Sequence, residues 1–151
     1  MLAIHPSFKL YQQERWQSLD VPQLVSDGEK SKAVNLTCPP QANPCVHGLI
    51  EGLASAAFNN VPVVLNRDNH SLSDQTLPDK FMVGVYTSGT MGKAKITWHE
   101  LSQLIPQKPL RASSDYRWLL SYHPMTFAGL QVLLHTITLG NELVVPDTTR
   151  V

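Results

Sequence analysis

The sequence has few charged residues, and their signs balance. Asp, Glu, Lys and Arg make up 16% of the 151 residues, whereas about 25% is usual for a soluble domain. We expect this shortfall to reflect unusually large buried or interfacial surfaces. The 12 basic and 12 acidic residues give a formal net charge of zero, so there is no electrostatic basis for a dedicated nucleic-acid-binding protein.

Segments that would direct the chain to a membrane, or through one, are also missing. No apolar run approaches the length of about 20 residues that a transmembrane helix needs. The first ten residues lack the basic region, apolar core and small-residue cleavage site of a signal peptide. The two cysteines, Cys38 and Cys45, are too few for a disulfide framework. These absences predict a cytoplasmic protein with reduced thiols and no membrane association.

The sequence does contain enough apolar residues for a folded core. Hydrophobic residues make up 42% of the chain, and its length suits a single domain of 1–151, or a piece of a larger one. Between Cys45 and Asn60 the apolar residues recur at helical spacing, which predicts an amphipathic helix. Short apolar segments at 33–37 and 61–65 flank this helix and are typical of strands, so the three elements predict a βαβ unit.

The rest of the chain continues this alternation. Residues 81–87, 117–122 and 142–145 are apolar enough for strands, and 127–139 is in helical register, with Gly140 as a C-terminal stop. Weaker patterns favour short helices over 7–17 and 99–105. The alternation predicts an α/β fold with a parallel-rich sheet of βαβ units flanked by helices.

The most informative segment, residues 85–95, is a glycine-rich and hydroxyl-rich loop that follows a predicted strand. It reads V-Y-T-S-G-T-M-G-K-A-K. Glycines permit close backbone approach and positive φ angles, and backbone amides, hydroxyls and lysines are the groups that bind a polyphosphate. Ligand sites of α/β proteins lie at the carboxyl ends of strands. We therefore predict that phosphate is bound by Thr87, Ser88, Gly89, Thr90, Gly92, Lys93 and Lys95.

Two common phosphate-binding motifs do not fit this segment. Gly89 and Gly92 are only three positions apart, and Ala94 follows Lys93, so the Walker pattern G-x-x-x-x-G-K-[ST] is not matched. The dinucleotide pattern G-x-G-x-x-G is absent as well.

The segment does resemble the phosphate loop of the adenylate-forming superfamily, which comprises acyl- and aryl-CoA synthetases, luciferases and the adenylation domains of peptide synthetases. The family's loop reads Y-T-S-G-T-T-G-x-P-K-G-V and is commonly followed by a histidine, for which His99 stands at the expected place. Met91, Ala94 and Ile96 depart from this pattern. Residues 59–66 are similar to the family's A-G-A-x-x-V-P-L-N-P stretch. Residues 121–145 resemble its L-P-L-F-H-x-x-G-L segment together with the helix and strand that follow.

This resemblance implies a truncated N-terminal portion of an adenylate-forming ligase fold, an AMP-binding-like domain. The family activates an acyl or aryl carboxylic acid with ATP and releases pyrophosphate. By resemblance, the loop would hold the β- and γ-phosphates of ATP with Mg²⁺, while Lys93 and Lys95 screen charge. Alignment on Gly129 places the family's aromatic-pocket histidine on Thr126, with His123 displaced by three residues. His123, Thr126 and Gly129 are therefore our candidates for the acid pocket.

Later motifs of the family are missing from the sequence: the Y-G-x-T-E segment for adenine and magnesium, the T-G-D ribose aspartate, the hinge and the C-terminal catalytic lysine. Two hypotheses follow. In the first, the chain is a non-catalytic or partner-dependent homologue that serves a biosynthetic pathway. In the second, it is an N-terminal piece or a split subunit of an active acyl- or aryl-acid ligase. We expect a homo-oligomer or a complementing protein subunit, and we assign no catalytic residue.

Simpler interpretations stay open for several of these residues. The loop could be an ordinary turn, or it could keep its geometry without binding ATP. Cys38, Cys45 and His47 do not amount to the four ligands of a zinc site, so we predict no metal site built from side chains. Adjacency of Cys45 and His47 is not the geometry of a thiolate–imidazole pair. His135 lies one position past a leucine stripe, and we assign it to packing.

Overall fold

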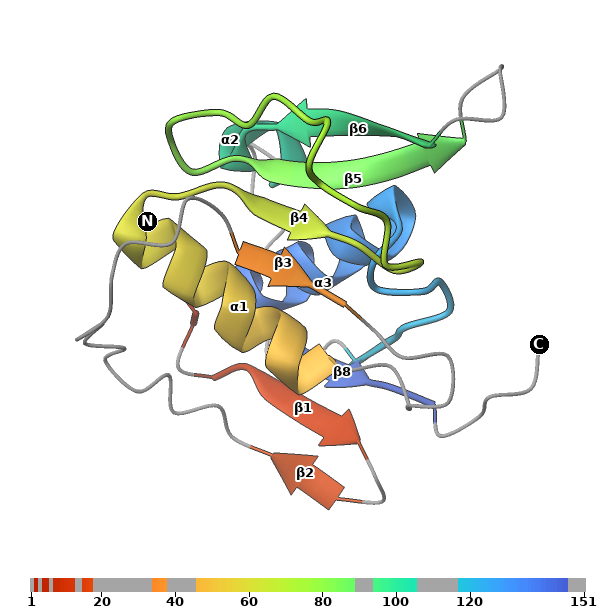
Figure 1. Cartoon of the computed structure of the whole chain (residues 1–151). Coiled ribbons are helices and arrows are strands. Elements are labelled where there is room, and N and C mark those ends of the chain that lie inside the picture. Colours follow the sequence, from red (N-terminus) through yellow and green to blue (C-terminus); the bar gives the residue numbers. More distant parts are fainter. Residues whose placement is uncertain are drawn as a thin grey trace.

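The computed structural model describes residues 2, 4–5, 7–12, 15–17, 34–37, 46–88, 94–105 and 117–146. They form two four-stranded sheets and three helices (Figure 1). The sheet in the upper half of Figure 1, here the upper sheet, has the order β3 (Val34–Leu36), β4 (Val63–Leu65), β5 (Val83–Ser88) and β6 (Ala94–His99). The lower sheet has the order β2 (Arg15–Gln17), β1 (Lys9–Gln12), β8 (Glu142–Val144) and β7 (Arg117–Leu119).

Each sheet contains one βαβ unit. Helix α1 (Val46–Asn59) connects β3 to its parallel neighbour β4, and helix α3 (Phe127–Leu139) connects β7 to its parallel neighbour β8. Strand β5 continues the upper sheet in parallel, and β6 returns antiparallel to it. Strand β1 lies parallel to β8, so the first and last described strands are neighbours. The predicted α/β class is therefore confirmed.

The arrangement differs from the predicted single parallel-rich sheet in two ways. There are two sheets, and each is mixed, because β2 and β6 run antiparallel to their neighbours. The short helix predicted over 7–17 is wrong: these residues contain β1 and β2. Side chains of β1 alternate between exposed Lys9 and buried Leu10, and Tyr11 pairs with Trp16 across the two strands with ring centroids 5.1 Å apart. Cross-strand pairing of this kind outweighs a weak helical pattern.

A second difference concerns the segment after the glycine-rich loop. The sequence pattern indicates no strand between the loop and a short helix at 99–105, but β6 occupies Ala94–His99 and leaves only Leu101–Leu104 for helix α2. Within β6 the side chain of Ile96 is buried while Lys95 and Thr97 are exposed. This period of two is the strand signature. Strands β5 and β6 pair antiparallel, so the glycine-rich segment begins in one strand of a β-hairpin and ends in the other.

One apolar cluster joins both sheets and the helices. Helix α1 contributes a buried stripe that includes Leu49, Ile50 and Leu53, and α3 contributes another that includes Leu133 and Leu134. Strand residues complete the cluster from both sheets: Leu10 and Leu143 from the lower sheet, and Val63, Leu65, Val83 and Val85 from the upper sheet. Each fully buried leucine of this kind stabilises the fold by about 1.5–3 kcal/mol.

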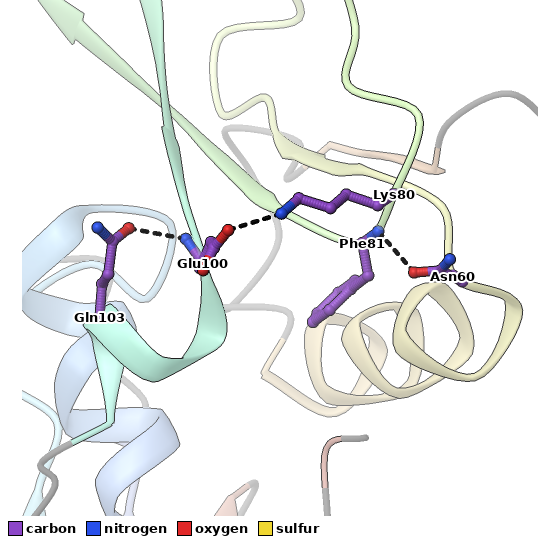
Figure 2. A network of polar contacts seen from close by, with 5 residues as sticks. All are labelled: Asn60, Lys80, Phe81, Glu100 and Gln103. Carbon is purple, nitrogen blue, oxygen red and sulfur yellow. Dashed lines mark hydrogen bonds and ion pairs between the residues drawn. The ribbon is translucent and has the colours of Figure 1, made fainter.

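Polar contacts fix the chain where α1 ends and β5 begins (Figure 2). Asn60 follows α1 with a positive φ of 53°, and its side-chain oxygen accepts a hydrogen bond of 3.0 Å from the Phe81 amide. Lys80 forms a 2.6 Å ion pair with Glu100, whose own amide donates to the side chain of Gln103 at 2.9 Å. Hydrogen bonding between Lys80 and Glu100 raises the pKa of the lysine and lowers the pKa of the glutamate.

We expect Asn60→Ala to lower the free energy of unfolding by about 2 kcal/mol. Of this, about 1 kcal/mol comes from forcing an alanine to adopt a left-handed conformation, and about 1 kcal/mol from the lost hydrogen bond to Phe81. Asn60→Gly accepts the positive φ and should lose only about the second part. Urea denaturation followed by circular dichroism measures the free energy of unfolding of both variants. Equal decreases for Asn60→Ala and Asn60→Gly would contradict this account.

Candidate functional site

The predicted phosphate segment begins and ends in the β5–β6 hairpin. Thr87 lies opposite Lys95, and Ser88 lies opposite Ala94. The Thr87 hydroxyl donates to the Lys95 carbonyl at 3.2 Å, so its proton is used within the hairpin. Thr87 and Lys95 have exposed side chains. The remaining predicted phosphate-binding residues, Gly89, Thr90, Gly92 and Lys93, lie outside the described residues, as does the side chain of Ser88.

A second loop, residues 66–70, follows the carboxyl end of β4. Asn66 is fully buried, and both ends of its amide bind the backbone of His70. Its side-chain nitrogen donates to the His70 carbonyl at 2.8 Å, and its side-chain oxygen accepts from the His70 amide at 2.7 Å. The backbone N–H of Asn66 donates to the Leu36 carbonyl at 2.8 Å, and this hydrogen bond connects the loop to the end of β3. A buried polar side chain that is paired in this way costs little desolvation energy.

The 66–70 loop reaches the hairpin through an aromatic contact. The rings of His70 and Tyr86 have centroids 4.7 Å apart at an interplanar angle of 44°. Tyr86 immediately precedes Thr87 in β5. The Tyr86 hydroxyl is buried and has no hydrogen-bond partner within the described ranges, and burial raises its pKa. On the other side, the His70 Nε2 atom lies 3.9 Å from an Asp68 carboxylate oxygen.

A third loop carries the three candidates for the acid pocket. Residues 120–126 connect the carboxyl end of β7 to α3, and Thr126 is the N-cap of that helix: its hydroxyl oxygen accepts from the Gly129 amide at 3.2 Å. The same hydroxyl donates to the His123 carbonyl at 2.7 Å. A Cβ atom on Gly129 would clash with that carbonyl, so glycine is required there. Thr126 and Gly129 thus have structural roles that hold His123 in place.

The Nδ1 atom of His123 accepts a hydrogen bond, which favours the neutral imidazole with its proton on Nε2. The Met125 amide donates to this Nδ1 atom at 3.1 Å, which leaves Nε2 to carry the proton. Burial lowers the pKa of His123, and the charge of Arg67 lowers it further, while Asp68 acts in the opposite direction. The charges of the 66–70 loop therefore act on the 120–126 loop. The candidate site therefore comprises the ends of the phosphate segment in β5 and β6, the 66–70 loop that contacts β5 through His70 and Tyr86, and the 120–126 loop.

His99 lies beside the 120–126 loop, because it contacts Phe127, the residue after Thr126, whereas His135 lies further along α3. The His135 ring contacts Trp118 edge-on at 5.2 Å, burial lowers its pKa, and its Nε2 atom is buried without a partner in the described part of the chain. It lines a cavity of about 330 Å³ together with Gln103, Leu104, Ile105, Trp118, Gln131 and Val132. Because its Nε2 atom is inaccessible, the packing role fits His135. His99 contacts Phe127 with ring centroids 5.0 Å apart.

Sequence reasoning missed Arg67, Asp68 and His70. They lie in a polar stretch with no motif, and only the folded chain brings them to the hairpin and to His123. The one sequence feature that points to this loop is Asn66. It directly follows the predicted strand at 61–65 and ends the stretch that is similar to the family. An asparagine directly after a buried strand indicates a structured turn.

Comparison of this chain with models of protein families, with curated proteins and with solved structures found no match. Within the described ranges, no helix is long and apolar enough to cross a membrane. In those same ranges, no three His, Cys, Asp or Glu residues are grouped so that they could hold a metal ion. Cys38 and Cys45 lie outside the described residues.

We expect the fold to lose stability as the pH falls below about 6.5, the ordinary pKa of histidine. The pKa of His123 is lower in the folded chain, so the unfolded chain binds the proton more strongly in that range. His135 acts in the same direction. His123→Asn keeps an acceptor for the Met125 amide but cannot titrate. Thermal melts between about pH 7.5 and 5.5 should show a smaller loss for this variant than for the parent, and an equal loss would contradict the assignment.

Proposed function

We propose that this chain supplies the triphosphate-binding hairpin of an adenylate-forming ligase and binds Mg²⁺-ATP. The observation that supports it best is the register of β5 with β6. Thr87 and Lys95 lie opposite each other at the base of residues 89–93, so the lysine of the motif is fixed beside the start of the loop. A cation next to backbone amides is the arrangement that recognises phosphate oxygens.

The acid would lie beside the 120–126 loop. His123 has a fixed tautomer whose Nε2–H can donate to a carboxylate, and Arg67 brings a positive charge to the same region. A hydrogen-bond donor beside a positive charge suits a carboxylate, and the family resemblance supplies an acyl or aryl carboxylic acid as the proposed substrate class. Mg²⁺ would come with the nucleotide, since its usual ligands in such sites include the phosphate oxygens.

We further propose that the chain does not adenylate an acid alone. The 151 residues contain neither the adenine and ribose motifs nor the catalytic lysine segment of the resembling family. Adenylation would then require a complementing polypeptide. The second candidate function is that of an N-terminal piece or split subunit of an active ligase. In that case, the complete ligase would form the acyl-adenylate and release pyrophosphate.

We expect the isolated chain to bind Mg²⁺-ATP and to show no ATP–pyrophosphate exchange. Lys95→Ala should weaken ATP binding at least about tenfold, which corresponds to about 1.4 kcal/mol, because it removes the cation at the base of the loop. Titration calorimetry measures affinity, and a thermal melt with millimolar Mg²⁺-ATP measures stabilisation.

Lys9→Ala is the matched control, because Lys9 is an exposed strand lysine of the lower sheet. It should leave ATP affinity unchanged. Absence of ATP binding by the parent chain would overturn the proposed function. Robust exchange by the isolated chain would overturn the proposed need for a complement.

We also propose that the chain self-associates or binds a complementing subunit through the lower sheet. Apolar side chains are exposed on β2, on β7 and just after β7: Trp16 (42% exposed), Leu119 (60%) and Tyr122 (60%). Strand β7 is the last strand of this sheet among the described strands, and an open strand edge favours pairing with another chain.

Light scattering should therefore give a mass above that of the monomer at micromolar concentration. Leu119→Lys should shift the protein towards monomer, because an exposed lysine opposes edge-to-edge association. Phe58→Lys is the control, because Phe58 lies on α1 and is 59% exposed. This substitution should leave the measured mass unchanged. A strictly monomeric parent chain would contradict self-association and leave a complementing subunit as the partner.

A further inference from the structure

The 66–70 loop has a shape that is set by one buried side chain. Asn66 binds both the amide and the carbonyl of His70, so a single amide group fixes two backbone atoms of that residue. Within the loop, Asn69 adopts a positive φ of 55° and donates its amide to the Asn66 carbonyl at 3.2 Å. Asparagine is one of the few residues that tolerate this conformation. The backbone at His70 is consequently held in one position relative to β4.

This fixed backbone directs the His70 ring onto Tyr86. The two rings lie 4.7 Å apart, within the range of favourable aromatic contacts. Asp68 lies 3.9 Å from the far nitrogen of the imidazole and favours the same ring orientation. His70 is nevertheless 41% exposed in its side chain, so it contributes little buried area to the core.

Tyr86 is the residue through which this contact can act on the hairpin. It pairs with Ile96 in β6 and directly precedes Thr87, which closes the base of the glycine-rich loop with Lys95. A hairpin of two strands is only marginally stable without support from a third element. Strand β4 supports β5 over Val83–Val85, and no described ladder pairing with β4 extends beyond Val85. The His70 ring therefore supports β5 where the sheet ends and the loop begins.

We propose that His70, oriented by Asn66, is a positioning residue for the phosphate-binding hairpin. It holds Tyr86 and so fixes the direction in which β5 enters the loop. This inference rests on the proposed function, because the positioned loop is the one that would bind ATP phosphates. Ordering a loop before its ligand arrives raises affinity by removing an entropic cost of binding.

The experiment compares ring removal with ring replacement. His70→Ala removes the ring, and His70→Phe keeps an aromatic group against Tyr86. His47→Ala is the matched control: His47 is 48% exposed and lies on α1. For each variant, Mg²⁺-ATP affinity is measured by calorimetry, thermal stability by a melt, and amide hydrogen exchange at Thr87 and Lys95 by NMR without nucleotide.

We expect His70→Ala to weaken ATP binding about tenfold and to speed exchange of the two hairpin amides about tenfold, with a melting temperature close to that of the parent. His70→Phe should restore both to within about threefold of the parent, and His47→Ala should change neither. A role in general stability alone would lower the melting temperature without a selective effect on the hairpin.

The outcomes separate the two proposals. If the parent binds ATP and Lys95→Ala loses it, but His70→Ala binds normally, the positioning role is wrong and the proposed function stands. If the parent does not bind ATP, the proposed function fails, and the phosphate-positioning role fails with it. In that case faster hairpin exchange in His70→Ala, reversed in His70→Phe, would assign the contact to hairpin order alone. Unchanged exchange together with unchanged affinity would overturn the inference completely.

Discussion

The structure depends on burying the apolar stripes of two helices between two sheets. Neither βαβ unit could bury its helix stripe alone, because β3, β4, β7 and β8 have only three residues each. Residues of α1, α3 and both sheets instead form one apolar cluster. The three site loops leave strands whose ends this cluster fixes, so their relative positions follow from the packing of the core.

Sequence pattern predicted the elements that bury a complete face. The helical spacing of 45–60 and of 127–139 corresponds to α1 and α3, because a helix against a core must repeat its apolar residues at that spacing. The sequence pattern did not predict strands β1, β2 and β6. These strands form through pairing with the strands beside them. Tyr11 of β1 pairs with Trp16 of β2, and Lys9 lies opposite Glu142 of the distant strand β8. Strand β6 pairs with β5, the described strand before it. The division into two sheets depends on which strands become neighbours, and no local pattern encodes that.

The candidate site was predictable only where a motif marks it. The segment containing Thr87 and Lys95 was found from its glycine and hydroxyl composition, and the hairpin explains why residues eight positions apart can act together. Arg67 and His70 carry no motif, because their contribution comes from tertiary contacts between loops. Thr126 and Gly129 were singled out as pocket residues, yet their contacts in the fold are with the His123 turn. Assignment of the loop to ATP stays a proposal.

The parallel pairing of β1 with β8 has a consequence for the order in which the chain can fold. All strands of the upper sheet lie between Val34 and His99, so they are made before β7 and β8. Strand β1 is the first of the described strands to be made, and its parallel partner β8 is the last. Closing a connection of that length is entropically expensive and slow. The strands of the upper sheet and the β1–β2 pair are thus all made before β8, and the edge of β1 that pairs with β8 stays open until β8 emerges.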